Sequence, residues 1–211
     1  RTPMIDIDFA RSSFPALATD WVLMDNAGGS VPLGSVIDRV ADVMHNKKGE
    51  MFSPMFLENK LKFSPYIKEA VIFGDKRDYV AALINIDPIV VGKWAEDRGI
   101  SYTTFMDLSA KPEVAALVKE QVAEINSRAE KEHFRIKRFA ILYKLLDMDD
   151  GELTKTGKIR RKYVREKYQN LYDALYDESI SEKEVEAFFQ YQDGQSTKVK
   201  TKISFYNMEG F

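Results

Sequence analysis

The chain has 211 residues, 45% of them hydrophobic and 30% charged, which is the composition of an ordinary globular protein. Its 31 Lys and Arg and 33 Asp and Glu residues give a net charge of −2, so no overall field favours nucleic acid or an anionic membrane. It has no cysteine, which excludes disulfides, thiolate metal sites and a cysteine nucleophile, and no apolar run approaches the roughly 18 residues that cross a bilayer.

This composition predicts a soluble, cytoplasmic protein of one or two domains with no nucleic-acid partner and no transmembrane segment. The only histidines, His45 and His133, are too scattered for a His-rich site, so no metal ligand is assigned. The opening residues carry acids and lack an apolar stretch, so no signal peptide is expected. The sequence carries no indication of the oligomeric state.

The first of three segments, residues 1–36, predicts a short helix at 5–14, an extended piece and a turn at Asn26–Ser30. Pro32 then stands where a helix can begin, because proline suits the first helical turn.

The second segment, residues 37–178, alternates strand-like and helical patterns. Apolar runs at 70–73 and 79–86, split by the polar turn GDKRD, predict a β-hairpin. After it we expect a proline-led helix at 88–94 and a second one from residue 112. A strand at 138–143 and a charged helix at 160–176 should follow. We therefore expect an α+β domain, a small mixed sheet with flanking helices.

The third segment, residues 179–211, predicts a β-hairpin with its turn at Asp193-Gly194. In its second half, apolar or hydroxyl side chains alternate with polar ones: Val199, Thr201, Ile203 and Phe205 against Lys198, Lys200, Lys202 and Ser204. This alternation predicts one buried face and one lysine-bearing wet face, and we interpret it as an edge strand.

Residues 149–161 read DDGELTKTGKIRR and place Lys158 on a Thr/Gly-rich turn before a basic helix. A lysine ammonium on such a turn can reach a phosphate-bearing site, although a solvated basic loop would have the same composition. The order of residues resembles the lysine motif of AMP-forming long-chain acyl-CoA synthetases, which are adenylate-forming ligases. Lys155 stands where that motif has proline, and Lys158 falls on its catalytic lysine. The loop 149–157 is acidic first and then polar and glycine-bearing, so we expect it to be exposed and the Lys158 ammonium to project into solvent.

Two upstream patterns carry the same resemblance, which extends over about residues 36–211. Asp38-Arg39 opens the sequence DRVADVM, which resembles the ligase hinge, and Gly49-Glu50 follows at the spacing of the glycine loop after it. The sequence SPMFLENKLKFSPYIKEAVIFG then resembles the helix that the family begins after this loop.

The resemblance implies the carboxy-terminal lid domain of an enzyme that couples a fatty acid to CoA through an acyl-adenylate. It implies that Lys158 is catalytic, that Asp38 is the hinge with Arg39 contacting AMP, and that Gly49 and Glu50 lie in a loop of the CoA channel. ATP, AMP, CoA and Mg²⁺ are the implied ligands, with none held tightly by this chain alone. Because the phosphate loop and nucleotide-binding core are missing from the sequence, we expect the isolated chain to be inactive.

The first segment, residues 1–36, is called the head below, and it carries a second, different resemblance. FPALATDWVLMDNAGGSVPLGSVIDRVADVM, with its distinctive Asn26–Ser30, resembles the start of cysteine desulfurase-like enzymes of the pyridoxal phosphate (PLP)-dependent class V aminotransferase group. No PLP-binding residue is assigned, because the His-Lys dipeptide of that family is absent. Three hypotheses stay open: a ligase lid, a fragment of a PLP enzyme, and a non-catalytic binding module. The sequence does not say whether such a mosaic is natural, misassembled or engineered.

Overall fold

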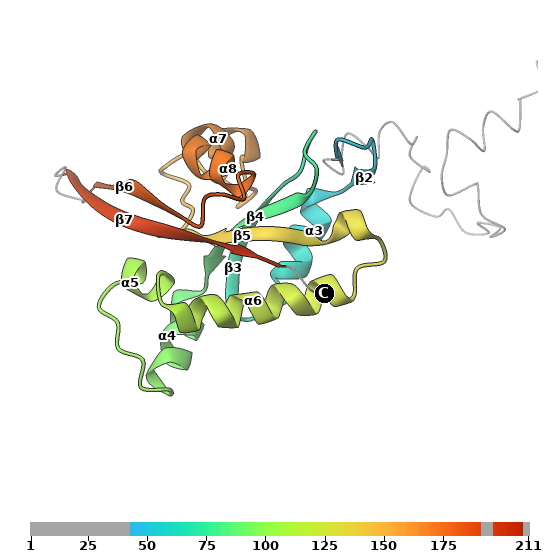
Figure 1. Cartoon of the computed structure of the whole chain (residues 1–211). Coiled ribbons are helices and arrows are strands. Elements are labelled where there is room, and N and C mark those ends of the chain that lie inside the picture. Colours follow the sequence, from blue (N-terminus) through green and yellow to red (C-terminus); the bar gives the residue numbers. More distant parts are fainter. Residues whose placement is uncertain (1–42, 191–195, 209–211) are drawn as a thin grey trace, which may run out of the picture. The chain divides into compact units, whose positions relative to one another are not determined.

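The computed structural model describes residues 43–190 and 196–208 (Figure 1). The features predicted at 5–14 and Asn26–Ser30 lie outside the described residues, and so do the hinge candidates Asp38 and Arg39 and the Asp193-Gly194 turn. Residues Met44–Phe211 belong to one compact unit.

The unit contains two sheets and several helices, in an α+β arrangement that confirms the predicted fold class. In chain order the described elements are β1 (Met44–His45), β2 (Met51–Phe52), α3 (Pro54–Leu61), β3 (Ile67–Phe73), β4 (Val80–Ile86), α4 (Pro88–Glu96), α5 (Phe105–Ser109), α6 (Pro112–Ser127), the 3-10 helix Glu132–Phe134, β5 (Ile136–Ile141), α7 (Arg161–Lys167), α8 (Gln169–Leu175), β6 (Glu182–Gln190) and β7 (Ser196–Asn207).

The larger sheet has five strands in the order β3-β4-β5-β7-β6. Strands β3 and β4 form the predicted antiparallel hairpin, with Val71 opposite Leu83. The chain then crosses through α4, α5 and α6, so β5 runs parallel to β4. Strand β7 pairs antiparallel with β5 on one side and with β6 on the other. The carboxy-terminal hairpin therefore extends the same sheet.

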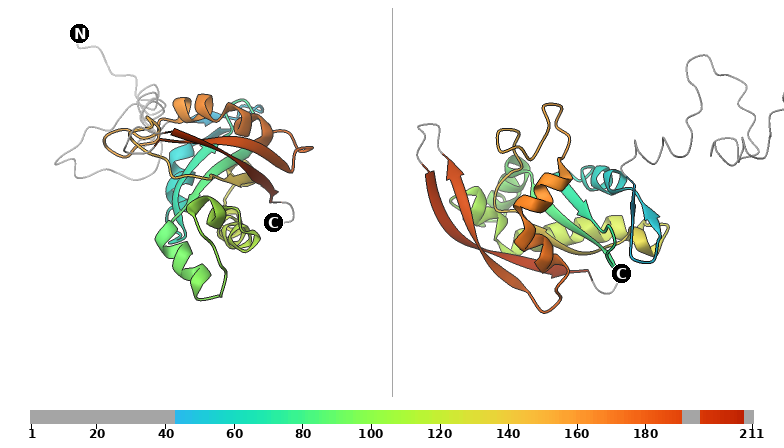
Figure 2. Two further views of the ribbon diagram at one scale, coloured as in Figure 1. Left: turned by 90° about the vertical axis from the view of Figure 1, so that its left-hand side faces the viewer. Right: turned by 90° about the horizontal axis from the view of Figure 1, so that it is seen from above.

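Helices cover both faces of this sheet, as Figures 1 and 2 show: α4 and α6 lie on one face and α7 and α8 on the other. Successive residues of β4 point to opposite faces, so Ile84 joins the α6 side while Leu83 joins the α7–α8 side. Because both faces are covered, β4 is apolar at every position except Asn85 instead of alternating, as strands buried on both sides are.

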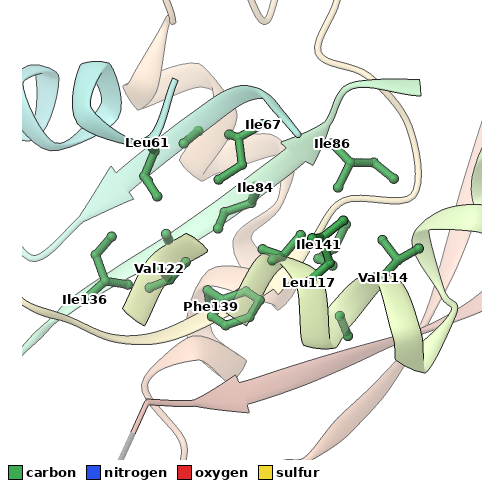
Figure 3. Packing of buried hydrophobic residues seen from close by; sticks show 14 of the residues in the cluster. Leu61, Ile67, Ile84, Ile86, Val114, Leu117, Val122, Ile136, Phe139 and Ile141 are labelled. Carbon is green, nitrogen blue, oxygen red and sulfur yellow. The ribbon is translucent and has the colours of Figure 1, made fainter. Parts of the chain in front are cut away.

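The core on the α6 side is a continuous apolar cluster (Figure 3). Val114, Leu117 and Val122 of α6 lie against Ile84 and Phe139 of the sheet. Val71 and Ile84 are 0% exposed and Leu117 is 7% exposed, which confirms that the predicted apolar runs form the core.

Two helices begin at the prolines that predicted them, Pro88 and Pro112, and α3 likewise begins at Pro54, where no proline-led start was predicted. The Asp87 carboxylate accepts hydrogen bonds from the backbone N–H groups of Ile89 and Val90, which have no partner inside the helix.

Two sequence predictions are wrong in detail. Strand β7 is not an edge strand, because β5 and β6 flank it; the edges are β3 and β6. Its lysine face is exposed nevertheless, and Lys198, Lys200 and Lys202 pair with glutamates of β6. The single helix predicted at 160–176 is instead two helices, because Tyr168 leaves helical geometry (φ −106°, ψ 33°) between α7 and α8.

Candidate functional site

Lys158 lies in a small hairpin whose arms meet at an isolated antiparallel bridge between Leu153 and Ile159. The turn is closed by a hydrogen bond from the Thr154 N–H to the Lys158 carbonyl (2.8 Å) and one from the Gly157 N–H to the Thr154 carbonyl (2.8 Å). Thr154 Oγ1 also accepts from the Lys158 N–H at 3.0 Å. Gly157 has a φ of +75°, the left-handed region that glycine adopts most easily. The Thr/Gly-rich sequence thus folds into a defined turn.

The base of this hairpin is fixed by Glu152, whose side chain is fully buried. Its Oε2 accepts from the Asp147 N–H (2.9 Å) and from Lys144 Nζ (3.0 Å). Its Oε1 accepts from the Tyr168 hydroxyl (2.6 Å) and contacts Lys167 Nζ at 3.0 Å. A buried carboxylate costs little free energy when it is paired and hydrogen-bonded on both oxygens, so this network locks the hairpin base to α7.

The pKa values of the neighbours follow from this network. Burial and the hydrogen bond to Glu152 raise the pKa of Tyr168 above its ordinary value. Burial acts to lower the pKa of Lys144, but its hydrogen bonds to Asp150 and Glu152 outweigh burial and the pKa is raised. At neutral pH Lys144 is therefore charged and Tyr168 is a neutral donor.

We expected the whole stretch 149–157 to be exposed, and Glu152 contradicts this. The tip does face solvent: Lys155, Thr156, Gly157 and Lys158 are exposed. Among the described residues the Lys158 ammonium has no ion pair, so the expectation that it projects into solvent holds. The loop extends away from the helices and the sheet (Figure 2).

The second predicted loop, around Gly49 and Glu50, connects β1 to β2. Asn46 organises it: its Oδ1 accepts from the N–H groups of Lys48 (3.0 Å) and Glu50 (2.9 Å), and its Nδ2 donates to Glu50 Oε2 (2.7 Å). Gly49 has a φ of +80° with no atom within 4 Å of the place a Cβ would take. The hydrogen bond from Asn46 and the nearby His133 help to lower the pKa of Glu50.

One buried charged residue, Glu58 in the helix that follows the Gly49 loop, was not identified from the sequence. Glu58 lies on the buried face of α3 together with Pro54, Leu57 and Leu61, and it contacts Arg161. The spacing of these four positions is that of one helical face, so an acid inside an otherwise apolar stripe was the available signal.

The family model described as the AMP-binding enzyme C-terminal domain matches residues 41–180, more than half of the chain. The chain belongs to this family. The resemblance of the head to cysteine desulfurases runs to Met44, overlaps this match only at residues 41–44, and is not supported by it.

Several curated long-chain ligases are similar to this chain. The long-chain-fatty-acid–CoA ligase FadD15 of Mycobacterium tuberculosis is 31% identical over 147 residues, which is 68% of this chain and 24% of the relative. The human long-chain-fatty-acid–CoA ligase 6 is 26% identical over 170 residues, 78% of this chain and 24% of the relative. The chain thus spans about a quarter of the length of these relatives.

Solved adenylation domains share the fold. The adenylation domain of a carboxylate reductase from Mycobacterium chelonae aligns with a TM-score of 0.52 at 21% identity, covering 67% of this chain and 20% of that one. The adenylation domain of a carboxylic acid reductase from Segniliparus rugosus, in complex with AMP and a co-purified carboxylic acid, aligns with a TM-score of 0.52 at 19% identity. The alignment covers 68% of this chain and 21% of that one. At this level of sequence identity the similarity shows a shared fold and carries no argument about function. In the described part of the chain, no helix is both long and apolar enough to span a membrane.

Proposed function

We propose that this chain is the lid of an AMP-forming long-chain fatty-acid–CoA ligase and works beside a nucleotide-binding core. In the proposed reaction a fatty carboxylate attacks the α-phosphate of ATP and releases pyrophosphate, and the CoA thiol then displaces AMP from the acyl-adenylate. The lid spans about residues 37–178 in this proposal, with 179–211 as an added hairpin and 1–36 as a separate head. The cytoplasmic location stays a prediction from the sequence.

We assign Lys158 to the first step, in which its positive charge would stabilise the reacting carboxylate and α-phosphate. The observation that supports this is an exposed ammonium, without an ion pair among the described residues, on a turn held by backbone hydrogen bonds. Negative charge gathers on the carboxylate and α-phosphate oxygens as they react. A cation already positioned near them stabilises the transition state without reorganising at that moment.

We assign the second step to the Gly49 loop, with Asp38 as the hinge and Arg39 as a contact to AMP. The open space around Gly49 supports this role, because a narrow thiol-bearing arm can approach the backbone where no Cβ stands. Rotation about a hinge would remove Lys158 and bring Gly49 and Glu50 to the CoA channel. Such a hinge is a common way of running two reactions in one cleft.

Within the described residues of this chain, no group of three or more His, Cys, Asp or Glu side chains is placed to hold the implied Mg²⁺. In the proposal ATP, AMP and CoA bind mainly through the core, and we derive no step through the metal.

The test supplies the chain with a ligase core whose own lid has been deleted and measures ATP–pyrophosphate exchange with a long-chain fatty acid. We expect exchange with the parent chain, and a loss of orders of magnitude for Lys158→Ala. Lys155→Ala is the matched control, since Lys155 lies three residues away on the same exposed turn; its effect should be small. Equal loss in both variants, or no exchange with any core, would favour a non-catalytic binding module.

The head is tested independently. Its resemblance to PLP enzymes predicts visible absorbance from bound cofactor when PLP is added to the chain. An unchanged spectrum would remove that hypothesis and leave the ligase proposal untouched.

A further inference from the structure

A buried ion pair connects α3 to α7. One nitrogen of the Arg161 guanidinium, NH2, lies 2.7 Å from Glu58 Oε1 and 2.8 Å from Glu58 Oε2. Both side chains are nearly covered, with 11% of Arg161 and 6% of Glu58 exposed. Glu58 Oε1 also accepts from the Ile72 N–H of β3 at 2.9 Å. One carboxylate thus holds a helix, a strand and a second helix 103 residues away.

The positions of the two partners in the chain matter as much as their contact. Glu58 lies in the helix that directly follows the Gly49 hairpin, because Ser53 caps α3 immediately after β2. Arg161 is the first residue of α7 and comes three residues after Lys158. The pair therefore ties the helix that follows the Gly49 loop to the helix that follows the Lys158 hairpin.

The electrostatics of the pair make it sensitive to the loss of either member. Burial raises the pKa of Glu58 to about 7 and lowers that of Arg161 to about 10, because each charged form loses water. The contacts at 2.7 and 2.8 Å stabilise the charged form of each partner, so each charge depends on the other. Removing one partner of such a pair is costly, while replacing both by apolar groups is often nearly neutral.

We propose that Glu58, through Arg161, is a positioning residue that couples the Gly49 loop to the Lys158 hairpin, so that the lid moves both as one rigid body. The catalytic part of this inference rests on the function proposed above. The mechanical part does not, because it concerns only contacts within the chain.

The first test is hydrogen exchange on the whole 211-residue chain. It follows the amides of Thr154, Gly157 and Lys158, each normalised to core amides of β4. Glu58→Gln keeps an acceptor for Ile72 but loses the charge, and it should speed exchange in the hairpin about tenfold. Glu124→Gln is the control, since Glu124 forms an exposed ion pair with Arg128 within the α6 region, away from Glu58 in the chain; hairpin exchange should not change.

A double variant separates positioning from stability. Glu58→Gln with Arg161→Met removes both charges and keeps an acceptor for the Ile72 N–H, so the melting temperature should return toward the parent value while the hairpin still exchanges fast. This variant also keeps the test possible if Glu58→Gln fails to fold. Hairpin exchange that returns to the parent rate in the double variant would show that the pair only adds stability and would overturn the inference.

The last arm uses the supplied core. In the double variant, kcat for pyrophosphate exchange should fall about tenfold with KM for ATP unchanged, the pattern of a displaced transition-state contact. Parent-like kcat in a lid whose Lys158→Ala variant is inactive would overturn the coupling. An active Lys158→Ala variant would instead refute the proposed function and leave the exchange result standing.

Discussion

The hydroxyl of Tyr168 donates a 2.6 Å hydrogen bond to Glu152 Oε1, a buried contact between the end of α7 and the base of the Lys158 hairpin. Tyr168, where the chain leaves helical geometry between α7 and α8, is buried, and its ring contacts Tyr143 edge-on at 6.4 Å between centroids. At this junction the chain thus presents a neutral donor to the carboxylate that anchors the hairpin.

Tyr168→Phe removes this donor and keeps the ring. We expect the free energy of unfolding to fall by about 1.5–3 kcal/mol, the usual worth of a hydrogen bond to a charged group, measured by urea unfolding. Tyr163→Phe is the control, because Tyr163 lies on the same helix and is 37% exposed; its effect should stay within about 0.5 kcal/mol. A loss of the same size in both variants would contradict the role of the Glu152 contact.

Asp150 gives the hairpin base an acid sensitivity of defined sign. The hydrogen bond from Lys144 lowers the pKa of Asp150, with burial opposing. Since the folded chain releases this proton at lower pH than the unfolded chain, the stabilisation is complete above the ordinary carboxyl range near pH 4 and disappears as pH falls through the folded pKa. Asp150→Asn should therefore destabilise the protein at pH 7 and have progressively less effect below about pH 4.

The measurement compares urea unfolding of the parent and Asp150→Asn across this pH range. Asp149→Asn, at the adjacent exposed carboxylate, serves as the control and should differ from the parent by a small, constant amount. A penalty for Asp150→Asn that persists at low pH would contradict the ion-pair explanation.

Local patterns in the sequence predicted most of the elements but not their arrangement. The apolar runs and the prolines at 88 and 112 mark strands and helix starts because these signals act within a few residues. The placement of β7 between β5 and β6 depends on pairing with residues of β5 that lie 65 to 69 positions earlier in the chain, which periodicity does not report. Lysines on alternate positions of β7 predicted its wet face correctly, while its neighbours in the sheet had to come from the structure.

In the candidate site, too, the sequence identified some residues and missed others. Lys158 and Gly49 were assigned by a resemblance in short motifs, and their roles stay predictions. Glu152 and Glu58 were missed because an acid is normally exposed, and their burial depends on cations contributed by other elements. Charged residues that support a site are thus harder to recognise than those displayed by it.

The buried side chain of Asn85 binds the segment just upstream of the Lys158 hairpin, and its replacement tests how much this contact stabilises the protein. It is 1% exposed, its Nδ2 donates to the Lys144 carbonyl (2.7 Å) and its Oδ1 accepts from the Leu146 N–H (2.8 Å). Asn85→Leu leaves both backbone groups buried without a partner and should cost about 2–4 kcal/mol, measured by thermal or urea unfolding. Asn59→Leu, on the exposed side of α3, is the control; an equal loss there would contradict this explanation.

Gly49 and Gly99 form a natural matched pair for testing the proposed CoA loop. Their φ angles are +80° and +68°, and at neither would an added Cβ meet an atom within 4 Å. Alanine therefore strains only the backbone at each site, by about 1–2 kcal/mol. We expect Gly49→Ala and Gly99→Ala to lower the free energy of unfolding by similar amounts.

The two variants should differ only in chemistry. With a core supplied, both should support pyrophosphate exchange at the parent rate, since neither change touches the Lys158 hairpin. Gly49→Ala alone should slow the release of AMP by CoA, because its methyl group stands where the thiol-bearing arm must pass the backbone. Single-turnover measurement from preformed acyl-adenylate isolates this step from adenylation. A thioester step slowed equally by Gly99→Ala would trace the effect to backbone strain, and a loss confined to adenylation would place the Gly49 loop in the wrong half of the reaction.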